Sequence, residues 1–274
     1  MIAFTQPVPF DEAIRFLLDK RLLPTTLDSA GLRDLARDVR EKSLFSARNN
    51  FETVLQDIQD KLGGLLRGEF NEATARAQVQ DSLDAIGYSP APEDAGGLKD
   101  LASDRRVRLV LETNLRQAAN FGLLEQGNDP ISRWQYPALE LIRIYDREEP
   151  RGEMPGSLGW QERFVRAGGQ LIDGRLIALK SDPVWSNLGN SDLFEDGLDS
   201  SVPPYAFNSG MGWREVPRDE ALELGLVGPG QMANQSDARF FDEELTEDAE
   251  QFSTDTLEQL SRSLQQRLSQ LNAA

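Results

Sequence analysis

Carboxylate and carboxamide side chains are concentrated between residues 190 and 200, and they are the sequence's richest group capable of chemistry. Its members are Asn190, Asp192, Glu195, Asp196 and Asp199. Hard cations such as Ca²⁺ take oxygen ligands of this kind. Counted from Asp192, Gly197 falls sixth, as an EF-hand loop requires, but Phe194 falls third, where that loop needs a ligand. Pro203 falls twelfth, in place of the bidentate glutamate. A solvated acidic loop is therefore the favoured interpretation, and a calcium or magnesium site is the alternative.

A second set of carboxylates has the composition of a general acid–base pair. Glycoside hydrolases, for example, use two such groups at a fixed separation. The set comprises Asp146, Glu148, Glu149 and Asp173. Because the sequence does not fix the distance between these carboxylates, ordinary exposed positions are the favoured interpretation.

The sequence contains no histidine and no cysteine. This removes the commonest general base, thiol nucleophiles, thiolate metal ligands and the Ser-His and Cys-His arrangements. The sequence also lacks a P-loop, a dinucleotide-binding fingerprint and a nucleophile elbow, since Asn208-Ser209-Gly210 lacks the flanking glycine pattern. We therefore predict no catalytic residues, no metal site and no cofactor.

The chain of 274 residues has 46 acidic and 29 basic side chains, which gives a formal net charge of −17. Such a charge opposes nonspecific binding to DNA phosphates and favours a basic partner surface. The local exception is a set of arginines on one predicted helix: Arg105, Arg106, Arg108 and Arg116. Pairing with neighbouring carboxylates is the favoured interpretation of these arginines, and a phosphate contact is the alternative.

Apolar residues recur at helical spacing through the N-terminal half, and their expected role is core packing. The pattern predicts a helix that Asp11 caps and Pro24 stops, helical structure over residues 32–62 with a break near residues 43–46, and helices over residues 72–86 and 104–122. Residues 89–97, rich in proline and glycine, read as a linker.

Residues 138–216 predict a small β-rich unit. Residues 139–145 alternate apolar and charged side chains, which is typical of a half-buried strand. Asp173-Gly174, within residues 171–179, predicts a type I′ hairpin turn, because both residues accept positive φ angles. The core of this unit is expected to consist of aromatic and proline side chains: Trp185, Pro203, Pro204, Phe207 and Trp213.

The last segment of the sequence changes character after Gly230. Residues 231–250 are polar and acidic, which predicts an extended arm. Asp255 and Glu258 then have the spacing of a capping box. The leucines that follow form one narrow helical seam: Leu257, Leu260, Leu264, Leu268 and Leu271. We predict that this amphipathic helix binds a partner, and packing against its own domain is the alternative.

Several short motifs run in a fixed order from Pro9 to Val227. They are Phe10–Lys20, Ser43–Arg48, Gly68-Glu69-Phe70, Ile86-Gly87-Tyr88, Thr113-Asn114 with Ala118, Asp146 with Pro150-Arg151, Asp173-Gly174, Asp182-Pro183 with Trp185, and Pro203-Pro204 with Phe207-Asn208 and Gly210. This order resembles the Mu F-like minor head proteins, the phage head morphogenesis family. Many members have a histidine after the motif at residues 146–151 and a Cys-Arg-Cys further on. In this sequence Arg214 occupies the position of that arginine, and Trp213 and Glu215 replace the two cysteines, so no metal or thiol role carries over.

The resemblance implies an α+β fold with a mainly helical N-terminal half. We expect a helical domain over residues 1–130, a small α+β unit containing a β-hairpin over residues 131–230, and an acidic arm with an amphipathic helix over residues 231–274. The implied function is that of a nonenzymatic structural protein in capsid assembly, near the portal of a tailed phage or prophage.

The expected partners are the portal protein and the major capsid or scaffold protein, with several copies of the chain per particle. A contact with DNA is the weaker expectation, and no membrane is expected, because no stretch approaches the roughly 20 apolar residues needed to span a bilayer. The implied location is the virion, and the host cytoplasm during assembly. Two alternatives are a metal-dependent hydrolase that uses the acidic loop and a toxin-delivery module related to the same family.

Overall fold

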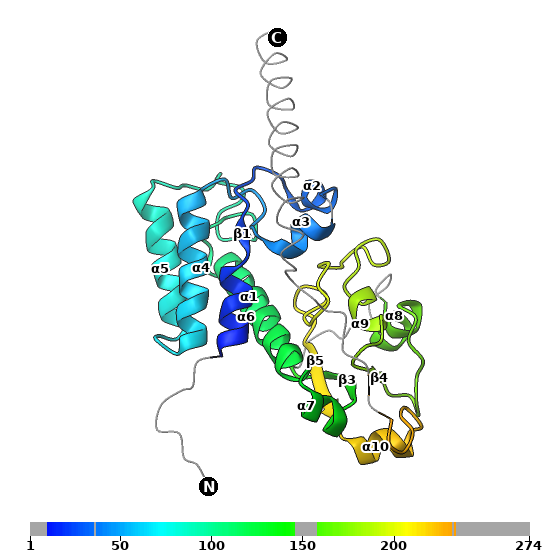
Figure 1. Cartoon of the computed structure of the whole chain (residues 1–274). Helices are drawn as coiled ribbons and strands as arrows, with labels where there is room; N and C mark the ends of the chain where they lie inside the picture. Colours follow the sequence, from blue (N-terminus) through cyan, green and yellow to red (C-terminus); the bar gives the residue numbers. More distant parts are fainter. Residues whose placement is uncertain (1–9, 36, 146–157, 232, 234–274) are drawn as a thin grey trace. The chain divides into compact units, whose positions relative to one another are not determined.

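The computed structural model describes residues 10–35, 37–145, 158–231 and 233, which combine helices with two small sheets (Figure 1). The α+β class predicted from the sequence is confirmed. Among the described residues, no helix has both the length and the apolar composition needed to cross a membrane. The predicted arm, the capping box and the five leucines of the predicted C-terminal helix lie outside the described residues, apart from Gln231 and Ala233. The predicted division at residue 130 stays a prediction.

The main body of the N-terminal half consists of α1 (Asp11–Leu18), α4 (Glu52–Arg67), α5 (Glu72–Ala85) and α6 (Asp104–Gln126). Helices α4 and α5 lie side by side (Figure 1), joined by a turn in which Gly68 has a φ of 71°. Helix α1 packs on α6, where the rings of Phe16 and Phe121 stack with centroids 4.5 Å apart. The apolar stripes of these helices are mostly buried, as the periodicity predicts, but Leu18 and Ile86 at their ends are exposed.

The segment between α1 and α4 contains short elements. Strand β1 (Arg21–Leu22) pairs in parallel with β2 (Ser43–Leu44), and α2 (Ser29–Arg33) and α3 (Arg37–Lys42) lie between them in the sequence. The predicted break near residues 43–46 is therefore present as a strand. The side chain of Gln59 on α4 is buried and donates to the carbonyls of Leu17 and Lys20, both at 2.9 Å. The first bond satisfies a carbonyl that the end of α1 leaves unpaired, and the second joins α4 to the residue before β1.

Side-chain caps begin several helices. Asn71, Ser103 and Asp129 accept backbone N–H groups at the starts of α5, α6 and α7 (Pro130–Gln135). The prediction that Asp11 caps α1 is wrong, because Phe10 is the N-cap residue and makes no side-chain cap bond. Asp11 is the first helical residue, where its carboxylate still faces the positive end of the helix dipole.

The larger sheet has three antiparallel strands in the order β4-β3-β5. Its central strand β3 (Ala138–Arg143) lies between β4 (Ile177–Leu179) and β5 (Met211–Val216). Helix α10 (Arg218–Glu223) follows β5, and its Ala221 is buried in a core cluster with Ala138, Ile177 and Val216. The predicted tight turn is confirmed, with φ angles of 52° at Asp173 and 77° at Gly174.

Aromatic side chains form the other core of this unit. Trp185 on α9 (Val184–Asn187) lies edge-on to Phe164 of α8 (Trp160–Arg166) and to Trp213 of β5, with centroids 5.7 and 5.8 Å apart. Tyr205 completes the group, 6.4 Å from Trp213, and is fully buried. Helix α8 was not predicted, because the proline- and glycine-rich residues before it read as a loop.

The predicted core residues of this unit occupy different environments. Trp185, Pro203 and Pro204 are buried, whereas Trp213 is half-buried. The prediction that Phe207 belongs to the core is wrong, because its side chain is 50% exposed. Tyr205, which comes directly after the two prolines, takes the interior position, and Phe207 lies in the turn that follows.

Candidate functional site

The acidic loop at residues 190–200 directs its carboxylates to separate arginines. Asp196 pairs with Arg163 at 2.6 Å, and buried Asp199 pairs with Arg40 at 2.6 Å. Glu195 is 93% exposed and approaches an arginine of α2. Within the described ranges, no group of three carboxylates is arranged to hold a metal ion. The loop therefore does not support the metal-dependent hydrolase that the sequence left open there.

The second predicted set of carboxylates is not assembled in the described residues. Asp173 lies in the tight turn before β4, where its backbone has a positive φ. Asp146, Glu148 and Glu149 lie outside the described residues.

Two arginines and two glutamates meet at the sheet instead. Glu140 is on the central strand β3, and Arg214 is its direct cross-strand partner on β5. Arg175 follows the tight turn and pairs with Ile172 across it. Glu220 is in the first turn of α10. We refer to Glu140, Arg175, Arg214 and Glu220 as the arginine–glutamate cluster.

Each guanidinium in the arginine–glutamate cluster contacts both carboxylates. Arg175 forms a bidentate pair with Glu140, at 2.8 Å from Nε and 2.7 Å from Nη2, and its Nη2 also donates to Glu220 at 2.6 Å. Arg214 donates to Glu140 from Nε at 2.9 Å and from Nη2 at 2.5 Å. It also donates to Glu220 from Nη1 at 3.1 Å and from Nη2 at 2.9 Å. The charges therefore alternate around a closed ring of strong hydrogen bonds.

The four side chains differ in solvent access and in pKa. Glu140 is nearly buried, at 11% exposed, whereas Arg214 is 38% exposed. The hydrogen bond from Arg175 is the main cause that lowers the pKa of Glu140, and Arg214 is the main cause that lowers the pKa of Glu220 to about 2. The same bonds raise the pKa of both arginines. All four groups are therefore charged at neutral pH.

The arrangement is suited to binding a phosphate group. A guanidinium presents a planar fork of N–H donors that matches the oxygens of a phosphate. The side chains of Arg175 and Arg214 are 34% and 38% exposed, and both donate hydrogen bonds to Glu140. Two arginines fixed in this way can stabilise the extra negative charge that develops on a phosphorus centre under attack.

Sequence reasoning did not single out Glu140, Arg175 or Glu220 as site residues. For Arg214, the sequence shows only that it occupies the position of the arginine in the Cys-Arg-Cys motif of many Mu F-like proteins. The available signals were weak: a charged residue within an otherwise apolar strand, and an arginine directly after an Asp-Gly turn. The decisive information is the pairing of β3 with β5, which brings together residues 74 positions apart.

Comparison with known proteins gives one result. The chain is 29% identical over 172 residues to proteins named exodeoxyribonuclease 7 large subunit from Xanthomonas campestris pv. campestris, in strains B100 and 8004. The match covers 58% of this chain and 36% of each relative, so the chain spans about a third of the length of these relatives. No family model matches the chain. No solved structure matches it.

This comparison corrects the function expected from the sequence. The predictions of a nonenzymatic structural head protein and of a role in capsid assembly are wrong, because the matching relatives are named for an exodeoxyribonuclease. The result favours one of the two alternatives that the sequence left open, a hydrolase.

Proposed function

We propose that the chain belongs to a hydrolase that cleaves phosphodiester bonds in DNA, with the arginine–glutamate cluster as its site. The observation that carries this proposal is the pair of partly exposed guanidiniums held on the nearly buried carboxylate of Glu140. The relatives' name, which denotes a deoxyribonuclease, agrees in reaction class and in substrate.

Substrate binding is the first step that the cluster supports. A backbone phosphate binds the outer edges of Arg175 and Arg214, and Glu220, which is more exposed than Glu140, gives up part of its contact with them. The phosphodiester carries one negative charge, so it can take over part of the Glu220 contacts with the two guanidiniums. The two arginines then fix the phosphorus centre above Glu140.

Proton transfer is the second step. The phosphate competes for the guanidiniums that keep the pKa of Glu140 low, so that pKa rises when substrate binds. Glu140 then accepts a proton from a water molecule while the oxygen of that water forms a bond to phosphorus. The bond between phosphorus and the leaving oxygen breaks, and the leaving oxygen takes a proton from solvent. Glu220 has a pKa of about 2, so it positions the arginines and does not donate a proton.

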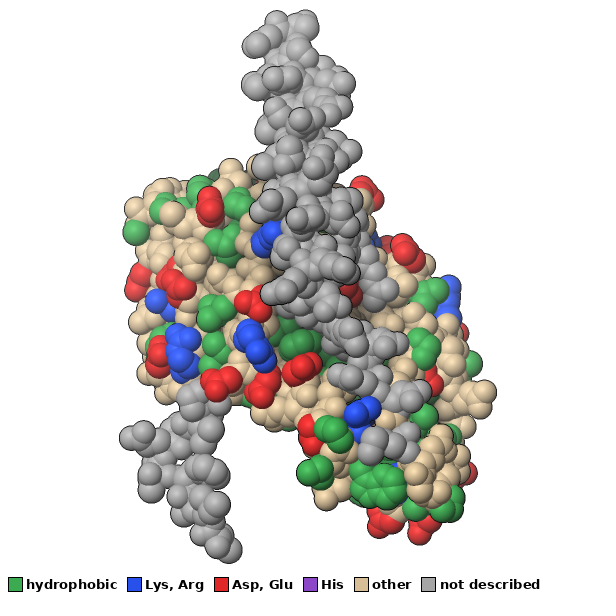
Figure 2. Space-filling view, viewed as in Figure 1, with side chains coloured by type: hydrophobic (Ala, Val, Ile, Leu, Met, Phe, Trp, Pro, Cys, Tyr) green, Lys and Arg blue, Asp and Glu red, His purple; other side chains and the backbone are tan. Residues whose placement is uncertain are grey.

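The charge of the chain sets the expected conditions for activity. A net charge of −17 repels a nucleic acid at long range, so attraction comes only from local cations. On the face shown in Figure 2, Lys and Arg side chains are scattered among Asp and Glu. We expect weak substrate affinity. The resemblance to Mu F-like proteins and the portal, capsid or scaffold partners stay predictions.

The test is a cleavage assay with the purified full chain and end-labelled single-stranded DNA, duplex DNA and RNA, in Mg²⁺ and in EDTA. Cleavage of DNA is expected in both conditions, because the arginines supply the positive charge at phosphorus. Arg175→Gln should lower the rate about 100-fold or more. The matched control is Arg67→Gln, since Arg67 forms a similarly exposed pair with Glu69 at 2.6 Å. Equal rates for the two variants, or no cleavage of any substrate, would contradict the proposal.

A further inference from the structure

A second group of cations lines a pocket in the N-terminal half. The pocket has a volume of about 220 Å³ and lies between the start of α2, the residues after β2 and the residues before α6. Its lining includes Asp28, Ala47, Arg48, Leu98, Lys99 and Arg106. This volume is below the roughly 300–1,000 Å³ of drug-sized ligand sites, so the pocket suits a small group.

The pocket lining carries three cations and one carboxylate. That carboxylate, Asp28, already accepts the backbone N–H groups of Ala30 and Gly31 at 3.1 and 3.0 Å, and it lies 3.9 Å from Arg48. Lys99 is 3.8 Å from Asp94, at the outer limit of an ion pair. On a chain that is strongly acidic overall, this excess of positive charge favours an anion.

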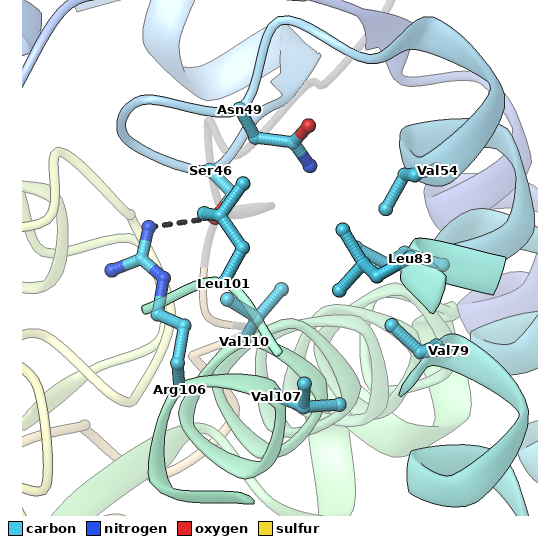
Figure 3. Close-up of a pocket in the computed structure, with 10 residues that line it drawn as sticks. Ser46, Asn49, Val54, Val79, Leu83, Leu101, Arg106, Val107 and Val110 are labelled. Carbon is cyan, nitrogen blue, oxygen red and sulfur yellow. Dashed lines mark hydrogen bonds between the residues drawn. The ribbon is translucent and has the colours of Figure 1, made fainter. Parts of the chain in front are cut away.

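Arg106 is the anchored cation of the pocket. Its Nη2 donates to the hydroxyl of Ser46 at 2.6 Å and to the carbonyl of Ala47 at 3.1 Å. Figure 3 shows a neighbouring, mainly apolar pocket that Arg106 also lines, in which its guanidinium is turned away from Val54 and Val79 and toward Ser46. Among the described residues, Arg106 forms no ion pair with a carboxylate, so its positive charge is not neutralised locally.

The arginines predicted as one basic cluster therefore have different roles. Arg108 and Arg116 pair with Glu112 along the exposed side of α6, as the favoured interpretation of that cluster expects. Arg106, one helical position from solvent-exposed Arg105, turns inward to the pocket. The alternative interpretation, a phosphate contact, applies to Arg106 alone.

The backbone of Arg48 also points to a constrained position. Arg48 has a φ of 62°, whereas the other described residues with positive φ are glycine, asparagine or aspartate. A long side chain seldom adopts this conformation, which is enriched at functional positions. Its N–H donates to the carbonyl of Leu27 at 2.7 Å, which holds Arg48 at the pocket wall.

We propose that the pocket formed by Arg48, Lys99 and Arg106 binds a phosphate group, either from a free nucleotide or from a nucleic acid chain. Arg106 supplies a fixed positive charge, with its Nη2 anchored on Ser46 and Ala47, and Arg48 and Lys99 contact the anion beside it. Leu98, which is exposed, offers an apolar surface beside the phosphate for a sugar or a base. The proposal does not depend on cleavage by the arginine–glutamate cluster.

The test measures binding of inorganic phosphate, AMP and a short single-stranded DNA to the full chain by titration calorimetry in low salt. Saturable phosphate binding is expected, and Arg48→Gln and Lys99→Gln should each weaken it at least about tenfold, the loss of a charge-assisted contact. The matched control is Arg108→Gln, because Arg108 lies on α6, the helix that carries Arg106, but outside the pocket.

Tighter binding of AMP than of the DNA would indicate a free nucleotide, and the reverse order a nucleic acid chain. Failure of phosphate to bind, or an equal loss in Arg108→Gln, would overturn the proposal. Because the assay reads binding, its outcome is independent of whether the chain cleaves DNA.

Discussion

Arg163 and Arg214 belong to the same small unit, yet the structure uses them in opposite ways. Arg163 is 2% exposed and is enclosed by the rings of Phe194 and Trp160, at 4.1 and 5.1 Å. Its donors are satisfied by the carbonyl of Leu188 and the carboxylate of Asp196. Arg214 is 38% exposed and shares two glutamates with a second arginine.

The difference separates a structural arginine from one available to a ligand. A fully enclosed guanidinium with every donor bonded cannot bind a phosphate without unfolding its surroundings. The two arginines of the arginine–glutamate cluster are each about a third exposed, so an anion from solvent can replace part of their carboxylate contacts.

The largest effect on stability is expected at the enclosed arginine. Arg163→Ala should lower the free energy of unfolding by about 3–5 kcal/mol, because it leaves a buried carbonyl and a carboxylate without their partner. Denaturant unfolding measures the loss. Arg166→Ala, an exposed position on the same helix, is the control and should change stability by less than about 0.5 kcal/mol. Similar losses at both positions would remove the distinction between the two environments.

Truncation of the half-buried tryptophan should have the next largest effect. Trp213→Ala should cost about 2–3 kcal/mol, somewhat below the range for fully buried aromatics, since it loses ring contacts with Trp185 and Tyr205. Phe207→Ala, at an exposed ring, should cost less than about 0.5 kcal/mol. A larger loss at Phe207 would show that the aromatic core extends to the turn.

Substitution of the partly exposed Arg214 should lower stability less than Arg163→Ala or Trp213→Ala. Arg214→Gln should lower the free energy of unfolding by about 1–2 kcal/mol, because Glu140 keeps its bidentate bond to Arg175. The same denaturation experiment measures this value. A loss equal to that of Arg163→Ala would mean that Arg214 is as structural as Arg163.

The smallest effect is expected at low pH, where the melting temperature tests the ion pairs of Glu220 specifically. The pKa of Glu220 is lowered to about 2, so its stabilising contribution is complete above its ordinary value of 4.5 and is lost as the pH falls toward 2. Glu220→Gln should therefore reduce the fall in melting temperature between pH 4.5 and 2. An unchanged fall in that variant would show that the ion pairs of Glu220 do not contribute to stability.

Local patterns in the sequence account for much of the fold. Helical periodicity located α5 and α6, alternation located β3, and Asp173-Gly174 located the tight turn, because each of these signals depends only on neighbouring residues. Helix α8 was missed for the same reason, because the proline- and glycine-rich residues before it predict a loop.

The candidate site depends on tertiary pairing and could not be read from spacing. Glu140 meets Arg214 only because β3 and β5 pair in one register, and Glu220 reaches both arginines only because α10 folds back after β5. The acidic loop shows the converse case. Its carboxylates are close in sequence, but the fold directs Asp196 and Asp199 to different arginines.

In the proposed reaction, Glu140 activates water at a phosphate held by two arginines. The most direct measurement is the turnover rate of Glu140→Gln on single-stranded DNA, together with its dissociation constant for that DNA. We expect a turnover rate lower by about 100-fold or more, as for loss of a general base, with a dissociation constant within about threefold of the parent chain. A folded Glu140→Gln variant that cleaves DNA at the parent rate would contradict this role of Glu140.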